Sequence, residues 1–309
     1  MTRSLRAVAI GAALAVVATP FLALTAATAA PGQAVLVFAN GAVSDDSPGS
    51  EIDQTIAGLE ANDATVTTFD GGDGSAVAWT AALTDIDVLV FPEIEGGDPY
   101  YEPGGTPWIS DEAVAVIAAW TEAGGDIILM GTMGSNAPAF LLDAISGLDF
   151  SSVWSTSDGG TPLQLVDTDS GLPVELEYAD GTYPIIDVAS WPEALLATLT
   201  PIYTTSDGTG LGVGRWTLGE GSFSYYAWDF YPWFDGEELS EENAAILADW
   251  YTALGELLTL ALDPVVVPAA PEAPQLAATG FDATGVVVGG MLLLAGGALL
   301  VLRRRAVTS

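Results

Sequence analysis

The chain contains no cysteine, no histidine and no lysine, so arginine supplies all six of its basic residues. Without cysteine no disulfide can form, even in a compartment that would allow one. A chain with so few cations has no basic patch to neutralise phosphates, which argues against nucleic acid as a partner. Surface salt bridges must also be scarce, so we expect the fold to rest on packing and backbone hydrogen bonds.

The C-terminal end carries three signals in a fixed order. The pentapeptide Leu276-Ala277-Ala278-Thr279-Gly280 precedes an apolar run, residues 283–302, which is followed directly by Arg303, Arg304 and Arg305. At about 1.5 Å per residue, a helix over the apolar run reaches roughly 30 Å, the thickness of the hydrocarbon core of a bilayer. The arginines favour a transmembrane helix whose basic tail, residues 303–309, stays in the cytoplasm.

This order resembles the cell-wall sorting signal of Gram-positive, actinobacterial-like surface proteins, in the LAxTG variant of the LPxTG motif. The resemblance implies that a sortase cleaves between Thr279 and Gly280. It also implies that Thr279 is then joined to peptidoglycan or to a pilus-like acceptor, so that the helix spans the membrane only before processing. The alternative is a plain single-pass anchor in which the pentapeptide has no role.

The N-terminal end has the pattern of a secretory signal peptide. Arg3 and Arg6 precede an apolar run, residues 7–24, and Ala27-Thr28-Ala29 forms a small-x-small cleavage site. We expect a signal helix over residues 1–29, with cleavage before Ala30. An uncleaved anchor is the alternative.

The exported part is extremely acidic. Of the 41 acidic residues, only Asp282 lies outside residues 30–279, whereas Arg215 is the one basic residue inside them. The formal charge of this part is therefore about −39, and self-repulsion should make its stability depend on ionic strength. The excess of acidic residues fits a solubility feature of an exported protein. The more specific hypothesis is that these residues bind divalent cations.

Between the two processed ends we expect one α/β extracellular domain and one spacer. Residues 30–262 have a globular composition and enough length for one large domain. Residues 263–275 contain four prolines among Ala and Val, which favours an extended polyproline-like spacer that holds the domain off the wall.

Short apolar runs alternate with helical periodicity in the first half of the domain. Strands are predicted over residues 34–38, 64–69, 88–91 and 126–130, and helices over 51–60, 75–83 and 111–123. Ser110 should cap the last of these helices, and Gly124-Gly125 should end it. Unbroken apolar strands that alternate with helices predict a mostly parallel sheet with helices on both faces.

The second half predicts an added β-rich part. Strands are expected over residues 164–167 and 174–178, and a hairpin over 211–217 and 222–228. A helix over 240–260, capped by Ser240, should close the domain and bury Trp250 on its apolar face.

Three stretches of this domain resemble the flavodoxin-like fold of class I glutamine amidotransferase-like domains. They are the strand-loop-strand opening, residues 35–67, the strand at 123–131, which leads to that fold's nucleophile elbow, and the hairpin at 214–223 with Asp229-Phe230. Active members of the family use a Cys nucleophile and a His base. This chain has neither residue, so that chemistry is excluded and the resemblance implies a non-catalytic relative.

Other chemistry depends on hydroxyl and carboxyl groups. Thr132 and Ser135 follow the elbow strand, but only a carboxylate is available as their base, so a polar turn with Ser135 or Asn136 as a helix cap is favoured. Paired carboxylates can hydrolyse glycans, and the candidates at strand ends are Asp70, Asp73, Glu93, Glu95 and Asp229.

Two further sites are hypotheses. One is a calcium site with the ligands Asp167, Asp169, Asp70 and Asp73, although these loops lack the full EF-hand pattern and solvated turns are favoured. Alternation along residues 223–228 places Phe223 and Tyr225 on one face and Tyr226 and Trp228 on the other, and most of these aromatic residues should belong to the core. Tyr231, Trp233 and Phe234 follow in a turn. A place in the core is favoured for them, and the alternative is an exposed platform that binds a sugar ring or a peptide. The sequence predicts no other cofactor.

Overall fold

The structure is a computed structural model, and it describes residues 32–49, 51–94, 99–131, 137–158, 162–177, 184–228 and 241–262. The chain divides into two units, Met1–Val265 and Val266–Ser309. All of the described residues belong to the first unit, which is a mixed α/β domain built on a large sheet.

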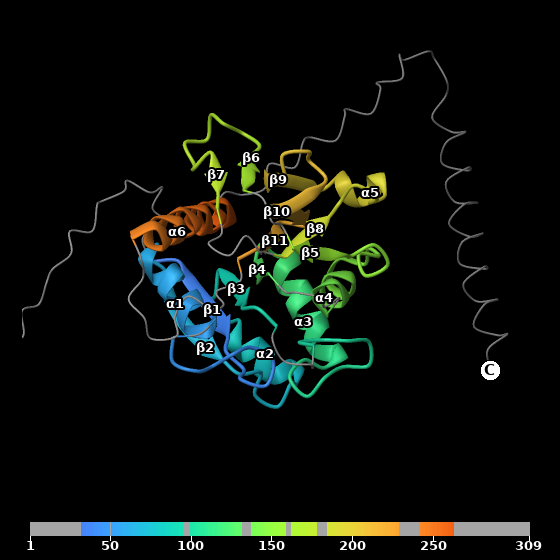
Figure 1. The fold of residues 1–309 in the computed structure, drawn as a ribbon. Coiled ribbons are helices and arrows are strands. Elements are labelled where there is room, and N and C mark those ends of the chain that lie inside the picture. Colours follow the sequence, from blue (N-terminus) through green and yellow to red (C-terminus); the bar gives the residue numbers. More distant parts are fainter. Residues whose placement is uncertain are drawn as a thin grey trace, which may run out of the picture. The chain divides into compact units, whose positions relative to one another are not determined.

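The elements of the domain follow one another in a βα alternation and then become mostly strands (Figure 1). The helices are α1 (Glu51–Ala61), α2 (Ala76–Ala82), α3 (Asp111–Glu122), α4 (Ala137–Ser146), α5 (Glu193–Leu196) and α6 (Glu241–Leu262). The strands are β1 (Ala34–Phe38), β2 (Thr65–Phe69), β3 (Val88–Phe91), β4 (Asp126–Met130), β5 (Thr156–Asp158), β6 (Leu163–Leu165), β7 (Glu175–Leu176), β8 (Pro184–Asp187), β9 (Leu199–Thr204), β10 (Gly210–Leu218) and β11 (Gly221–Tyr226).

The described strands form one 11-stranded sheet in the order β2-β1-β3-β4-β11-β10-β9-β6-β7, with β8 on β10 and β5 on β8. From β2 to β11 all neighbours are parallel, and from β11 onward they are antiparallel. The expected parallel sheet with an added β-rich part is therefore present.

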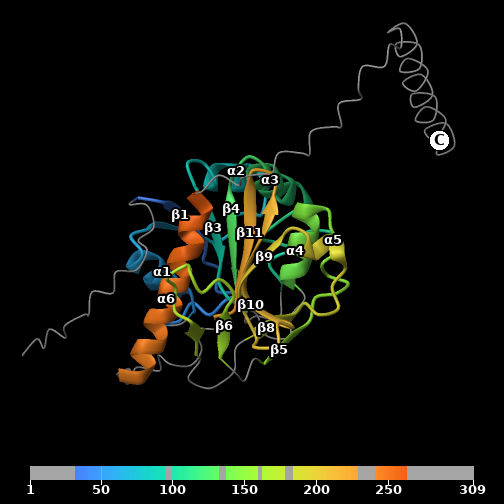
Figure 2. The ribbon, with the colours of Figure 1, turned by 90° about the horizontal axis from the view of Figure 1, so that it is seen from above.

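Helices cover both faces of the parallel half (Figures 1 and 2). Helices α2, α3 and α4 neighbour one another on one face, and α1 packs against α6 on the other. The contact between α1 and α6 is close at Gly58, where a Cβ atom would lie 2.9 Å from the ring of Tyr251. Strands buried on both faces explain why β1 and β3 are continuous apolar runs and why β4 is one after Asp126.

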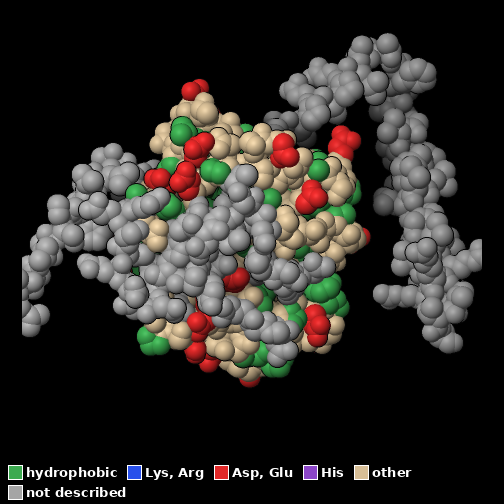
Figure 3. All heavy atoms as spheres, viewed as in Figure 1, with side chains coloured by type: hydrophobic (Ala, Val, Ile, Leu, Met, Phe, Trp, Pro, Cys, Tyr) green, Lys and Arg blue, Asp and Glu red, His purple; other side chains and the backbone are tan. Residues whose placement is uncertain are grey.

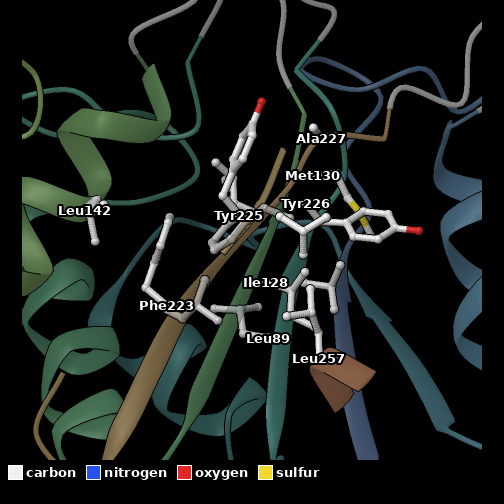
Figure 4. Close-up of a cluster of buried hydrophobic side chains, with 14 of the residues drawn as sticks. Leu89, Ile128, Met130, Leu142, Phe223, Tyr225, Tyr226, Ala227 and Leu257 are labelled. Carbon is white, nitrogen blue, oxygen red and sulfur yellow. The ribbon is translucent and has the colours of Figure 1, made fainter. Parts of the chain in front are cut away.

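The aromatic residues of β11 alternate between the two faces, as the sequence predicts. Figure 4 shows Phe223 and Tyr225 on the side of Leu142 in α4, and Tyr226 on the other. The hydroxyl of Tyr226 donates to the carbonyl of Trp250 in α6 at 2.5 Å, and the ring of Trp250 lies 4.8 Å from that of Trp228. These residues belong to the core, where α6 closes the sheet.

Most predicted elements of the first half are confirmed to within a residue or two. Ser75 and Ser110 cap α2 and α3, each accepting a hydrogen bond from the backbone three residues on. The hairpin is also confirmed, because Leu218 pairs with Gly221. Two strands are shorter than expected, since β6 and β7 cover only Leu163–Leu165 and Glu175–Leu176.

Candidate functional site

The carboxyl ends of parallel strands are the usual place for a binding site in an α/β sheet. Here the loops after β1 and β2 are tied together by Asn40, whose side-chain amide donates to the carbonyl of Asp70 at 2.6 Å. The Asn40 side-chain oxygen accepts from the backbone of Ala42 at 3.0 Å, which shapes the loop that leads to α1. The buried side chain of Asn40 thus holds the loops after β1 and β2 together at this edge.

Tyr100 is the centre of a buried polar cluster at the same edge. Its ring packs on Phe38 of β1 and Phe91 of β3, with centroid distances of 5.2 Å and 4.9 Å. Its hydroxyl donates to the carbonyl of Pro92, so the 3.1 Å contact with Ser44 uses the serine hydroxyl as the donor. The loops after β1 and β3 therefore meet at this side chain.

The charges of two buried glutamates act on the Tyr100 hydroxyl. Glu51 is the first residue of α1 and Glu93 follows β3, and only 1% and 6% of their surfaces are exposed. Burial raises the pKa of Tyr100 far above its usual value, the bond from Ser44 opposes this, and the charges of Glu93 and Glu51 raise it further. Tyr100 is therefore neutral at any physiological pH and remains a donor.

We call Ser44, Glu51, Glu93 and Tyr100 the carboxyl-edge cluster. Two buried carboxyl groups whose charges act on one buried hydroxyl are candidates for proton transfer, which is the minimal equipment of a carboxylate-dependent hydrolase. Glu93 is among the acids singled out from the sequence, whereas Glu51 and Tyr100 are not. Glu51 looks like an ordinary acid in the first turn of a helix, and nothing in the sequence around Tyr100 predicts its burial.

A second polar cluster lies at the opposite, amino-terminal edge of the sheet. Asp126 begins β4, and its carboxylate accepts from Ser222 of β11 and from Arg215 of β10, the latter at 3.3 Å. Burial raises the pKa of Asp126 to about 6, although the bonds from Ser222 and Arg215 lower it. Among the described residues this is the only salt bridge, and it serves to join β4, β11 and β10.

The four acids proposed for calcium are exposed, and the carboxylates of three of them shape turns. Asp70 accepts from the backbone of Gly72 at 2.9 Å, Asp73 from Ser75 at 3.1 Å, and Asp167 from Asp169 at 3.1 Å. Within the described ranges no three acidic side chains gather closely enough to hold a metal ion. In these loops the carboxylates act as acceptors for their own backbone.

The acid excess is spread over the surface. Figure 3 shows acidic side chains at several separate places on the face in view, and no basic side chain among the coloured residues. Hydrophobic side chains are interspersed with them, so the visible face has no single charged patch to mark a site.

Several predicted sites lie outside the described residues. They are the signal peptide with Ala27, Ala29 and Ala30, the elbow residues Thr132, Ser135 and Asn136, Glu95, Asp229, the platform Tyr231, Trp233 and Phe234, the cap Ser240, the spacer, and the sorting signal Leu276–Gly280 with its apolar run. In the parts of the chain that are described, no helix has the length and apolar character needed to cross a membrane.

Comparison with known proteins assigns no family. No family model matches the chain, and neither does any curated protein. Solved structures that align with it include an exo-β-1,4-mannosidase from Opitutaceae bacterium strain TAV5, with 14% identity, a TM-score of 0.39, and coverage of 75% of this chain and 36% of that one. A cytoplasmic protein from Salmonella typhimurium LT2 aligns with 10% identity, a TM-score of 0.43, and coverage of 74% and 98%.

A ThuA-like protein from Bacteroides uniformis aligns with 9% identity, a TM-score of 0.40, and coverage of 75% and 95%. The chain thus spans about a third of the mannosidase but nearly the whole of the other two proteins. With every TM-score below 0.5, these likenesses assign neither a family nor an activity.

Proposed function

We propose that this protein is exported, anchored to the cell wall by a sortase, and displays a non-catalytic α/β domain with a binding or structural role. The observation that carries the proposal is the order of signals at the C-terminal end: LAATG at 276–280, an apolar run at 283–302 and three arginines. The signal peptide at the other end supports the same route. Sortase and peptidoglycan, or a pilus-like acceptor, are the partners, and the extracellular ligand is unidentified.

The architecture of the domain supports a flavodoxin-like, amidotransferase-like origin. Its parallel strands follow the order β2-β1-β3-β4-β11, with helical connections up to β4, which is the doubly wound pattern. The family's nucleophile and base have no counterpart, because the chain contains no Cys and no His. We infer that such a domain keeps the fold for display and binding.

Cell fractionation of a sorting variant tests the proposal. Thr279→Ala should abolish release of the chain by wall digestion and leave it in the membrane fraction at full length. Thr284→Ala is the matched control, because it changes the only other Thr-Gly step of the tail and should anchor normally. Equal wall anchoring of both variants would contradict the proposal that a sortase anchors the chain.

A carboxylate-dependent extracellular glycan hydrolase is the second candidate. It is favoured by one observation, the burial of Glu51 and Glu93 at the carboxyl edge, where their charges act on Tyr100. It ranks second because both side chains are more than nine-tenths buried, which leaves little room for a glycan. Turnover on a broad panel of wall polysaccharides, lost in Glu93→Gln and Glu51→Gln but kept in Asp149→Asn, would establish it.

A calcium-stabilised adhesin is the third candidate. It is supported by acidic loops such as the one at Asp167 and Asp169, where two carboxylates lie two residues apart. Each loop needs further oxygen ligands to complete a calcium site of 6–8 oxygens. A rise in melting temperature that calcium causes and magnesium does not would separate this candidate from the first.

A further inference from the structure

Strand β2 (Thr65–Phe69) forms an open edge of the sheet. It is the terminal strand of the order and pairs with β1, and no other described strand pairs with it. Three of its five residues, Thr65, Thr67 and Thr68, are exposed, in contrast to the fully buried β3 and β4. The edge is therefore accessible as well as unpaired on its outer side.

The hydrogen bonds to β1 show which backbone groups face outward. Thr65 donates its backbone N–H to Gln33, and Phe69 accepts from Ala39, each at 2.8 Å. In a parallel ladder alternate residues bond to the same neighbour. Thr65, Thr67 and Phe69 thus bond to β1, and Val66 and Thr68 present their N–H and C=O groups to the outside.

The five residues of β2 have none of the features by which an edge strand itself prevents pairing. Protected edge strands carry charged residues such as Lys, a Pro or a bulge, or are very short. The sequence of β2 is Thr-Val-Thr-Thr-Phe, which has none of these residues and a high strand propensity. The opposite end of the sheet differs, because β7 has only two residues, Glu175–Leu176.

Acidic residues flank the open edge at both ends. Asp63 lies two residues before β2 and Asp70 directly after it, and both are exposed. At roughly 3.3 Å per residue of strand, the seven steps between them span at most about 23 Å, because Asp63 lies in a turn with a φ of 61° before the strand begins. A second copy of this domain is a poor partner, because antiparallel pairing of two β2 strands would bring these acids together.

We propose that the outer edge of β2 binds an extended protein segment, which adds a strand to the sheet and carries basic residues at both ends of an uncharged core. The backbone of Val66 and Thr68 supplies the hydrogen bonds, as in other cases of strand addition. Asp63 and Asp70 select a cationic segment over an acidic one. This inference concerns the domain alone and does not depend on wall anchoring.

A designed octapeptide, Lys-Val-Thr-Val-Thr-Val-Thr-Lys, is the probe. Its lysines are seven steps apart, which matches the spacing of Asp63 and Asp70. Fluorescence polarisation with the labelled peptide and the full chain in detergent gives the affinity, and hydrogen exchange with mass spectrometry gives the place of binding. The expected result is slower exchange at the amides of Val66 and Thr68, with affinity that falls as salt is added.

Thr68→Pro is the decisive variant. It removes an outward N–H, which an edge strand tolerates, and should weaken binding about tenfold or more. Thr68→Val is the matched control, because it keeps the N–H and the branched side chain, and it should bind as the wild type does. Protection elsewhere in the chain, or full affinity in the proline variant, overturns the proposal.

A second test does not depend on how well the proline variant folds. Asp63→Asn and Asp70→Asn remove charge only, and asparagine suits the left-handed backbone of Asp63, whose φ is 61°. Together the two substitutions should weaken the binding of the lysine peptide and leave the binding of a peptide with terminal glutamines unchanged. Equal affinity of the wild type for the lysine peptide and for its glutamate counterpart contradicts the selection by charge.

Discussion

The guanidinium group of Arg215 lies 3.3 Å from the carboxylate of Asp126, at the amino-terminal edge of the sheet. Arg215 is the only basic residue between positions 7 and 302, and it forms an ion pair with a buried aspartate. The hydroxyl of Ser222 donates to the same carboxylate. This pair joins the parallel half of the sheet to the antiparallel half, because β4 belongs to one and β10 to the other.

The pH dependence of stability should reflect Asp126. Its pKa is raised from 3.8 to about 6, so the folded state holds this proton more tightly than the unfolded chain. The resulting stability is fully present below pH 3.8 and is lost as the pH rises through about 6. Relative to Asp126→Asn, the free energy of unfolding of the wild type should fall by on the order of 2–3 kcal/mol over this range.

Urea unfolding at a series of pH values measures this difference. The exposed Asp149 provides the control, because Asp149→Asn should follow the wild type at every pH. If the wild type and Asp126→Asn had parallel pH profiles, the raised pKa of Asp126 would be refuted.

The closing helix should depend on one buried hydrogen bond. Burial raises the pKa of the Tyr226 hydroxyl well above its usual value, so the group stays protonated and donates to the carbonyl of Trp250. Tyr226→Phe keeps the ring, which lies 5.3 Å from that of Trp250, and should cost about 1 kcal/mol of unfolding free energy. Tyr226→Leu should cost more, because it also removes ring contacts. A phenylalanine variant as stable as the wild type in chemical denaturation would show that the bond contributes nothing.

The start of β11 should accept only glycine. A Cβ atom on Gly221 would lie 2.1 Å from the carbonyl oxygen of Gly125 and 2.4 Å from that of Thr121. Because these are backbone atoms, the sheet would have to move, and Gly221→Ala should cost about 2–4 kcal/mol. Gly208 has open space around it, so Gly208→Ala should cost only the strain of its φ of 74°, about 1 kcal/mol. Similar melting temperatures for the two variants would contradict the close approach.

Much of this fold follows from the sequence, because unbroken apolar runs between helices are the mark of a buried parallel sheet. Val88–Phe91 is predicted to the residue for that reason, and Ser110, which is predicted as the cap of α3, fixes the start of that helix. Strands β5, β8 and β9 are not predicted, since short antiparallel strands take their identity from their neighbours. Pro201 within β9 also weakens its signal.

The candidate site is less predictable. Glu93 stands out at the end of a strand, but in the sequence Glu51 has only the pattern of an acid in the first turn of a helix, and its burial comes from tertiary packing. Tyr100 lies in a loop rich in Gly and Pro, where no hydrophobic periodicity predicts which side chains are buried. The aromatic strand β11 is predicted correctly as core, because its alternation places Phe223 and Tyr226 on opposite faces.

Calcium should change the stability of this domain only by screening the repulsion between its acidic side chains. The exposed loops at Asp167 and Asp70 use their carboxylates for turns, and self-repulsion of the acidic surface falls with any divalent cation. Calcium chloride at about 5 mM, enough to fill a typical extracellular site, should therefore raise the melting temperature no more than magnesium chloride does. A rise specific to calcium, and absent in Asp167→Asn, would instead establish the adhesin candidate.

Mass spectrometry of the C-terminus in purified cell walls decides whether a sortase anchors this chain. After wall digestion, we expect a terminal peptide that ends at Thr279 and is joined to a wall fragment, with residues 280–309 absent. An intact chain that retains Arg303, Arg304 and Arg305 and is found dissolved in the cytosol would contradict this expectation.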